Sequence, residues 1–166
     1  MEMNLVIGTM TFADIEPVLQ IDRESFPTPW SPALFEQELR CAFSRNLVAK
    51  RIDGRDAELA GYICTWFVAG EMHVQTLAVR KALRKRGIAS RLVAEAMRAA
   101  RTERISAATL EVRRSNRAAF RLYEKFGFVV KGIRPRYYHD TGDDALIMWA
   151  DLDRKENGQD HDLEHP

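Results

Sequence analysis

The sequence predicts an α/β fold of the α+β type, in which about four helices pack on a mixed, mostly antiparallel sheet of about six to seven strands. Apolar residues recur with a period of two in several short segments and with a helical period in others. Three strand-like segments follow one another through short connections, which is typical of an antiparallel meander. Strand-like and helix-like segments then alternate, which is typical of a mixed sheet.

The expected elements can be placed along the chain from these patterns. Strands are expected at 5–7, 46–52, 59–68, 72–79, 107–113, 128–132 and 145–152. Helices are expected at 15–26, 32–39, 88–103 and 116–126. Ser31 and Pro32 supply an N-cap and a first-turn proline for the second helix, while Ser115 and Gly127 bound the fourth. One face of the third helix is expected to be buried through Ile88, Leu92, Val93, Ala96, Met97 and Ala100.

Length and composition predict a single domain at residues 1–152 followed by a polar, disordered tail at 153–166. The longest nearly apolar stretch, 59–70, is shorter than the roughly 18 residues that a membrane span needs. The first ten residues lack the features of a signal peptide. We therefore expect no membrane association and a cytoplasmic location, whereas the oligomeric state is left open.

Charge and cysteine content exclude several classes of function. The 25 basic side chains nearly balance the 24 acidic ones, so no direct nucleic-acid binding is expected. Cys41 and Cys64 lie in apolar patterns and give neither a disulfide framework nor metal-ligand spacing, so no metal is expected. Bases do cluster locally, because residues 80–104 contain nine Lys or Arg and two acids. A small anionic ligand is therefore expected near this segment.

The strongest local motif is a turn between the strand at 72–79 and the third helix. It reads Arg84-Lys85-Arg86-Gly87-Ile88-Ala89. A glycine turn at a helix N-terminus presents unpaired N–H groups and the positive end of the helix dipole, which together bind phosphates. Taken alone, the same pattern also fits a solvated basic helix cap.

Two candidate catalytic side chains follow the turn. Strand alternation places Glu111 on the same face as Thr109 and Arg113, pointing either into a cleft or into water. Tyr123 falls on the apolar face of the fourth helix, where a tyrosine is most often a core residue. The spacing alone leaves both interpretations open.

Aromatic residues in two other segments are candidates for binding a substrate. Trp30 lies in Phe26-Pro27-Thr28-Pro29-Trp30, which fits a packed corner as well as a binding wall. Tyr137 and Tyr138 follow the predicted strand at 128–132, and they fit either ordinary packing or a groove wall.

Four blocks taken together resemble the GNAT superfamily of N-acetyltransferases, over about residues 5–150. Arg84-x-x-Gly87-x-Ala89 is similar to its coenzyme motif. The block from Leu110-Glu111-Val112-Arg113 through Ser115-Asn116 to Leu122-Tyr123-Glu124-Lys125-Phe126-Gly127-Phe128 is similar to its downstream region. Segments 26–31 and 136–148 are similar to the RimI subfamily, which acetylates the amino terminus of a ribosomal protein. Arg84, Ala89 and the inserted Thr28 depart from the commonest pattern.

The resemblance implies a GNAT fold with splayed central strands and acetyl-CoA as co-substrate. Glu111 would be the general base and Tyr123 the general acid that protonates the departing thiolate, with no covalent acyl-enzyme. Trp30, Tyr137 and Tyr138 would line a groove for the acceptor. The coenzyme would contact Leu77, Ala78, Val79, Lys85, Arg86, Gly87, Ile88, Ala89, Ser90 and Asn116.

By resemblance, the acceptor is a protein N-terminus, the alanine terminus of a small-subunit ribosomal protein. An α-amino group, with a pKa of about 7.7 to 8.0, loses its proton far more easily than a lysine at about 10.4. Two alternatives stay open. One is another amine, such as a different N-terminus, a lysine, a polyamine or an aminoglycoside. The other is a regulatory module that binds acyl-CoA without catalysis.

Overall fold

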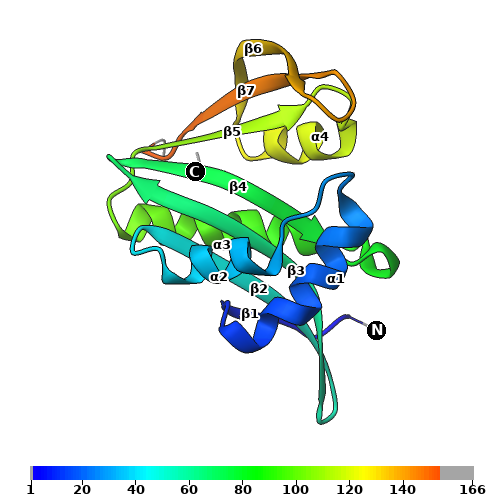
Figure 1. The fold of residues 1–166 in the computed structure, drawn as a ribbon. Helices are drawn as coiled ribbons and strands as arrows, with labels where there is room; N and C mark the ends of the chain where they lie inside the picture. Colours follow the sequence, from blue (N-terminus) through cyan, green and yellow to red (C-terminus); the bar gives the residue numbers. More distant parts are fainter. Residues whose placement is uncertain (1, 154–166) are drawn as a thin grey trace, which may run out of the picture.

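The computed structural model describes residues 2–153 as a seven-stranded sheet flanked by four α-helices (Figure 1). The strand order is β1-β2-β3-β4-β5-β7-β6. Neighbouring strands are antiparallel except for β4 and β5, which are parallel. The predicted fold class is confirmed. Apart from Asp153, the predicted tail lies outside the described residues, and the domain boundary at residue 152 stays a prediction.

The elements follow the predicted order along the chain. The strands are β1 (Leu5–Thr9), β2 (Ser44–Asp53), β3 (Asp56–Val68), β4 (Glu71–Val79), β5 (Ala107–Arg113), β6 (Val129–Tyr138) and β7 (Asp143–Asp151). The helices are α1 (Ile15–Ser25), α2 (Pro32–Arg40), α3 (Ile88–Thr102) and α4 (Arg117–Lys125), with short 3-10 turns at Phe12–Asp14 and Lys81–Leu83.

The main correction to these boundaries concerns β6. The sequence predicted that this strand would end at Gly132, but it continues to Tyr138. Gly132 and Pro135 are typical of strand breaks, yet the long partner β7 holds the segment in a ladder that tolerates two register shifts. The extension matters because it places Tyr137 and Tyr138 at the end of a hairpin.

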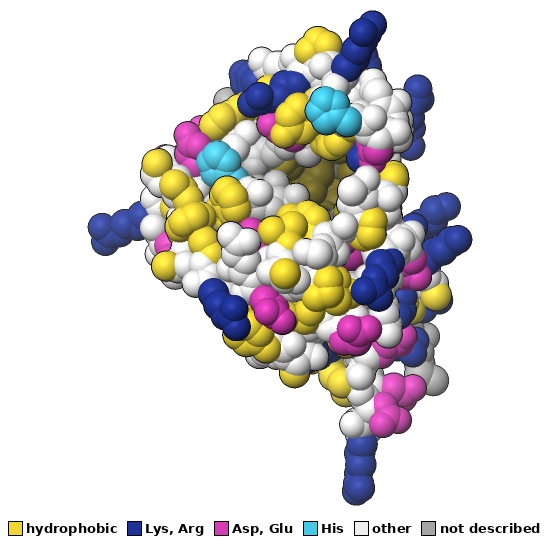
Figure 2. Space-filling model, in the orientation of Figure 1, with side chains coloured by type: hydrophobic (Ala, Val, Ile, Leu, Met, Phe, Trp, Pro, Cys, Tyr) yellow, Lys and Arg dark blue, Asp and Glu magenta, His cyan; other side chains and the backbone are white. Residues whose placement is uncertain are grey.

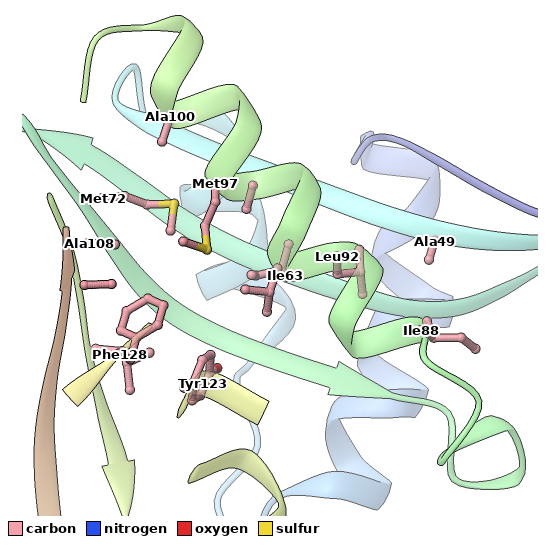
Figure 3. Packing of buried hydrophobic residues seen from close by; sticks show 14 of the residues in the cluster. Ala49, Ile63, Met72, Ile88, Leu92, Met97, Ala100, Ala108, Tyr123 and Phe128 are labelled. Atoms are coloured by element: carbon pink, nitrogen blue, oxygen red, sulfur yellow. The ribbon is translucent and has the colours of Figure 1, made fainter. Parts of the chain in front are cut away.

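Helices cover both faces of the sheet (Figure 1). On one face α3 packs on β2, β3 and β4, and its apolar stripe is buried in the larger core (Figure 3). Burying each large side chain of this stripe contributes about 1.5–3 kcal/mol. The buried residues of α3 are the predicted ones, namely Ile88, Leu92, Val93, Ala96, Met97 and Ala100.

The second core lies on the opposite face, under α1 and α2. Ser31 caps α2 as predicted, since its side chain accepts a hydrogen bond of 3.2 Å from the Leu34 N–H, and Pro32 occupies the first turn. Asp22 is fully buried in α1, and the Tyr62 hydroxyl of β3 donates a hydrogen bond to it. These contacts fix the two ends of the connection between α1 and α2.

None of the helices within residues 2–153 has both the length and the apolar composition that crossing a membrane requires.

Candidate active site

The turn before α3 has the backbone of an anion-binding site. Gly87 is the N-cap residue and has a φ of 80°, a left-handed conformation that favours glycine. The Arg91 N–H makes the first helical bond, to the Gly87 carbonyl at 3.1 Å, so the N–H groups of the first turn are left without helical partners. Lys85 and Arg86 are exposed beside them. The arrangement presents partial and full positive charge to an anion.

Arg84, the first position of the motif, faces away from this charge cluster. Its Nε donates to the Val79 carbonyl at 3.0 Å, and its Nη2 donates to the Ser25 hydroxyl at 3.0 Å. The side chain therefore fastens the turn to the end of β4 and to α1. Lys85 and Arg86 are therefore the two basic side chains of the motif that lie exposed beside the N-terminus of α3.

A gap opens in the middle of the sheet beside this turn. The parallel pairing of β4 with β5 runs from Glu71 to Val74, whereas β4 itself continues to Val79. Leu77, Ala78 and Val79 therefore lie beyond the last pair, and the predicted divergence of the central strands is confirmed. Figure 2 shows a deep hollow with hydrophobic atoms at its floor, at the level where β4 and β5 diverge in Figure 1.

Glu111 points toward the β6–β7 hairpin. Its Oε1 lies 3.1 Å from Nε of Arg134, in a partly exposed ion pair. A hydrogen bond with Glu111 also raises the pKa of the Tyr137 phenol. The alternation allowed Glu111 to point either into a cleft or into water. In the structure its carboxylate faces Arg134 and Tyr137 of the hairpin.

Tyr123 is buried on α4, in the core that α3 also lines, and its ring lies 5.5 Å from the ring of Phe128 (Figure 3). Burial, with a smaller contribution from Tyr138, raises the pKa of the Tyr123 phenol. The phenol therefore stays protonated at neutral pH and can serve as a proton donor. The core interpretation and the catalytic one are compatible, because the ring packs while the hydroxyl keeps its proton.

The rings of the two hairpin tyrosines, Tyr137 and Tyr138, lie against each other. Arg136 has a φ of 50°, and the ladder with β7 shifts register between Arg134 and Tyr138. This irregularity places the rings of Tyr137 and Tyr138 5.2 Å apart, nearly perpendicular at 87°. Burial, assisted by Glu111 and opposed by Arg113, raises the pKa of Tyr138 to about 12.

Trp30 lies just before α2 and packs as a corner residue. Its ring centroid is 5.0 Å from that of Phe35, and its backbone N–H donates to the buried Asp22 carboxylate at 2.6 Å. Only part of its surface is exposed. The structure thus favours the packing interpretation for the ring, although the loop before it approaches the hairpin.

Asn116 is the N-cap residue of α4, in place of the predicted Ser115. Its side-chain oxygen accepts from the Ala119 N–H at 3.2 Å. The Ser115 hydroxyl hydrogen-bonds instead to Asp143, because the adjacent β6–β7 hairpin brings that carboxylate within reach.

Sequence reasoning missed Arg134, Asp140 and the role of Arg113. Arg113 makes two hydrogen bonds of 2.8 Å to Asp140, and its guanidinium carbon lies 3.9 Å from the centre of the Tyr138 ring. The one available signal was the strand alternation, which put Arg113 on the face of Glu111. Residues 2–153 contain no group of three or more His, Cys, Asp or Glu side chains suited to a metal ion.

Comparison with known proteins identifies the architecture. Residues 15–128 match the model of the acetyltransferase (GNAT) family. The chain belongs to the GNAT family. Two relatives support this assignment over nearly the whole chain. The N-alpha-acetyltransferase RimI of Mycobacterium tuberculosis is 35% identical over 150 residues, which are 89% of this chain and 92% of that protein. The [ribosomal protein bS18]-alanine N-acetyltransferase of Salmonella typhimurium is 29% identical over 145 residues, which are 86% and 94% of the two chains.

A solved GNAT structure has the same fold. The ribosomal-protein-S18-alanine N-acetyltransferase from Escherichia coli superposes with a TM-score of 0.81 at 24% identity, covering 95% of this chain and 98% of that one. The predicted GNAT membership is therefore confirmed by sequence and by fold.

Proposed function

We propose that this GNAT protein transfers an acetyl group from acetyl-CoA to the α-amino group of a protein N-terminus, and that its acceptor is the N-terminal alanine of ribosomal protein bS18. The joint placement of a carboxylate and a protonated phenol carries the proposal. Glu111 raises the pKa of Tyr137, the Tyr137 and Tyr138 rings lie 5.2 Å apart, and Tyr138 adds to the raised pKa of the buried Tyr123. The name of the relative at 35% identity supports an α-amino acceptor, and the name of the relative at 29% identity supports the alanine of bS18. Ribosomal proteins are made in the cytoplasm, where we propose that the enzyme acts.

The coenzyme would lie in the gap between β4 and β5. Leu77, Ala78 and Val79 would offer backbone hydrogen bonds to the pantetheine arm, and one N–H would stabilise the negative charge that develops on the thioester oxygen. The turn at residues 85–90 would hold the pyrophosphate, with Lys85 and Arg86 supplying charge. Asn116 would contact the pantetheine through its amide nitrogen, because its oxygen already caps α4.

The reaction needs a neutral amine and a protonated leaving group. Glu111 would accept a proton from the acceptor ammonium, directly or through one water. The amine nitrogen would then attack the thioester carbonyl carbon, forming the C–N bond while the C–S bond breaks. Its second proton would pass to water, and water would later return a proton to the Tyr123 phenolate left by the next step. Tyr123 would protonate the departing thiolate, and burial keeps its phenol in the protonated form that this role needs. Neither cysteine is needed, and burial raises the pKa of the Cys64 thiol so that it remains protonated.

The acceptor groove would run between the loop ending at Trp30 and the hairpin bearing Tyr137 and Tyr138. Tyrosines with one apolar face and one polar end suit an extended peptide backbone. Glu111 lies beside this hairpin. A peptide in the groove would therefore bring its α-amino group to the proposed general base.

The decisive assay measures CoA release by thiol detection, with acetyl-CoA and peptides that begin Ala-Arg, Met-Lys or Ser, beside free lysine and spermidine. We expect release with the alanine peptide. Glu111→Gln and Tyr123→Phe should each lower kcat by about 100-fold or more, the contribution typical of general acid–base catalysis. Glu124→Gln, which changes an exposed glutamate of α4, is the matched control and should retain activity.

Other outcomes would redirect the proposal. Release with lysine or spermidine alone would reassign the acceptor while leaving the coenzyme site intact. Tight binding of acetyl-CoA without release from any amine would contradict the proposed activity and indicate a regulatory binding module.

A further inference from the structure

The loop between α1 and α2 packs on the core at both ends, through Phe26 and Trp30, and is exposed between them. The backbone N–H of Trp30 donates to one carboxylate oxygen of the buried Asp22 at 2.6 Å, and the Tyr62 hydroxyl donates to the other oxygen. Pro27, Thr28 and Pro29 are exposed ahead of this anchor. Two prolines restrict the backbone here, so these three residues form a short, stiff arm.

The facing hairpin presents a carboxylate held in a fixed orientation. Asp140 receives two hydrogen bonds of 2.8 Å from Arg113, whose Nη1 also donates to the Thr141 hydroxyl at 2.9 Å. The hydrogen bonds from Arg113 lower the pKa of Asp140, so the group is ionised at neutral pH. The same guanidinium lies over the Tyr138 ring at 3.9 Å, and the orientation of Asp140 is therefore coupled to that of a proposed groove residue.

A single contact joins the arm to the hairpin. The Thr28 hydroxyl donates to Oδ2 of Asp140 at 3.2 Å, across 112 positions of sequence. Within residues 2–153 it is the one hydrogen bond between residues 26–31 and residues 129–143. Figure 1 shows these two segments converging beside the gap between β4 and β5.

We propose that Thr28 and Asp140 form a clasp across the mouth of the acceptor groove and act as positioning residues for the acceptor, with Arg113 as the fixed support of the clasp. The inference rests on the proposed function. The contact is exposed and has a neutral donor, so the clasp opens at a small cost to admit an acceptor or release a product. When closed, it connects Trp30 on one wall with Tyr138 on the other through Asp140 and Arg113, and so holds the groove at one width.

The test separates acceptor binding from the chemical step. Thr28→Val keeps the shape and removes the donor, and it should raise the acceptor KM by about three- to tenfold, which corresponds to the loss of one such bond. The KM for acetyl-CoA and the kcat should change by less than about twofold, since neither depends on this contact. Thr28→Ser restores the hydroxyl and should return the acceptor KM to the wild-type value. Thr102→Val, which removes an exposed hydroxyl on α3, is the matched control.

A second measurement does not require turnover. Hydrogen exchange followed by mass spectrometry should show faster exchange of residues 26–29 and 138–142 in Thr28→Val than in the wild type or in Thr102→Val. An unchanged acceptor KM in Thr28→Val, or a failure of Thr28→Ser to restore it, would overturn the positioning role. If the wild type acetylates no peptide, the proposed function fails by itself, and equal exchange rates in Thr28→Val and the wild type would then overturn the clasp as well.

Discussion

Gly61 leaves no room for a side chain where β3 meets the end of β4. It pairs with Val79 in the ladder. A Cβ added to it would lie 2.9 Å from the Ala78 carbonyl oxygen, and 3.3 Å from both Leu92 Cδ1 and Val79 Cγ2. The nearest of these atoms belongs to the backbone and cannot rotate away. Gly61→Ala must therefore displace the part of β4 that we propose to hydrogen-bond the coenzyme.

The size of the effect follows from two opposing contributions. Overpacking of this kind costs about 1–3 kcal/mol. Replacing a glycine inside a strand returns about 0.5–1 kcal/mol, since alanine loses less backbone entropy on folding. We expect Gly61→Ala to lower the free energy of unfolding by about 1–2 kcal/mol, or Tm by about 2–8 °C. Misplacing one or two backbone donors should also weaken acetyl-CoA binding by about tenfold.

Urea denaturation and calorimetric titration with acetyl-CoA measure the two effects. Gly8→Ala in β1 is the matched control, because a Cβ at Gly8 would meet nothing within 4 Å. It makes the same chemical change in a strand and should leave both quantities unaltered or slightly increase stability. Equal urea midpoints and equal affinities for the two variants would refute the reasoning, because the close approach at Gly61 would then have no energetic consequence.

Three further predictions concern the N-terminal half. Ser31→Ala removes the cap of α2 and should lower the free energy of unfolding by about 1 kcal/mol in urea. Burial alone would raise the pKa of Asp14, but its hydrogen bonds and Lys50 outweigh that effect and lower the pKa below 3.8. Its stabilisation is therefore present above that pH and is lost as the pH falls through the lowered value. Asp14→Asn should be less stable than the wild type at pH 7 and nearly equal to it at about pH 2, and a deficit independent of pH would contradict this. Asp22→Asn and Tyr62→Phe should each cost about 1–3 kcal/mol, and the double variant less than their sum; strict additivity would show that the two groups do not interact.

Local patterns were sufficient wherever a local cause determines the structure. The buried stripe of α3 follows from helical spacing, and the turn at Gly87 follows from glycine's access to positive φ. Alternation along β5 placed Glu111 and Arg113 on one face, and both do reach the hairpin.

Contacts between distant segments could not be predicted in this way. Nothing in the neighbourhood of Asp140 indicates that it pairs with Arg113, 27 positions earlier. Asp22 has the charge of a surface residue, and its burial depends on a tyrosine from β3 that arrives 40 positions later. The length of β6 likewise depends on β7 and not on its own glycine and proline.

The parallel ladder between β4 and β5 joins two half-sheets through four residue pairs, from Glu71–Ala107 to Val74–Leu110. Beyond Val74, β4 no longer pairs with β5, so the middle of the sheet contains an unpaired strand edge in addition to the two outer edges. A ligand that hydrogen-bonds along this interior edge binds the folded chain and not the unfolded one. At one hundred times its Kd, such a ligand adds about 2.7 kcal/mol to the free energy of unfolding. We therefore expect the supply of acetyl-CoA to influence the lifetime of the folded protein in the cell, as well as its rate of catalysis.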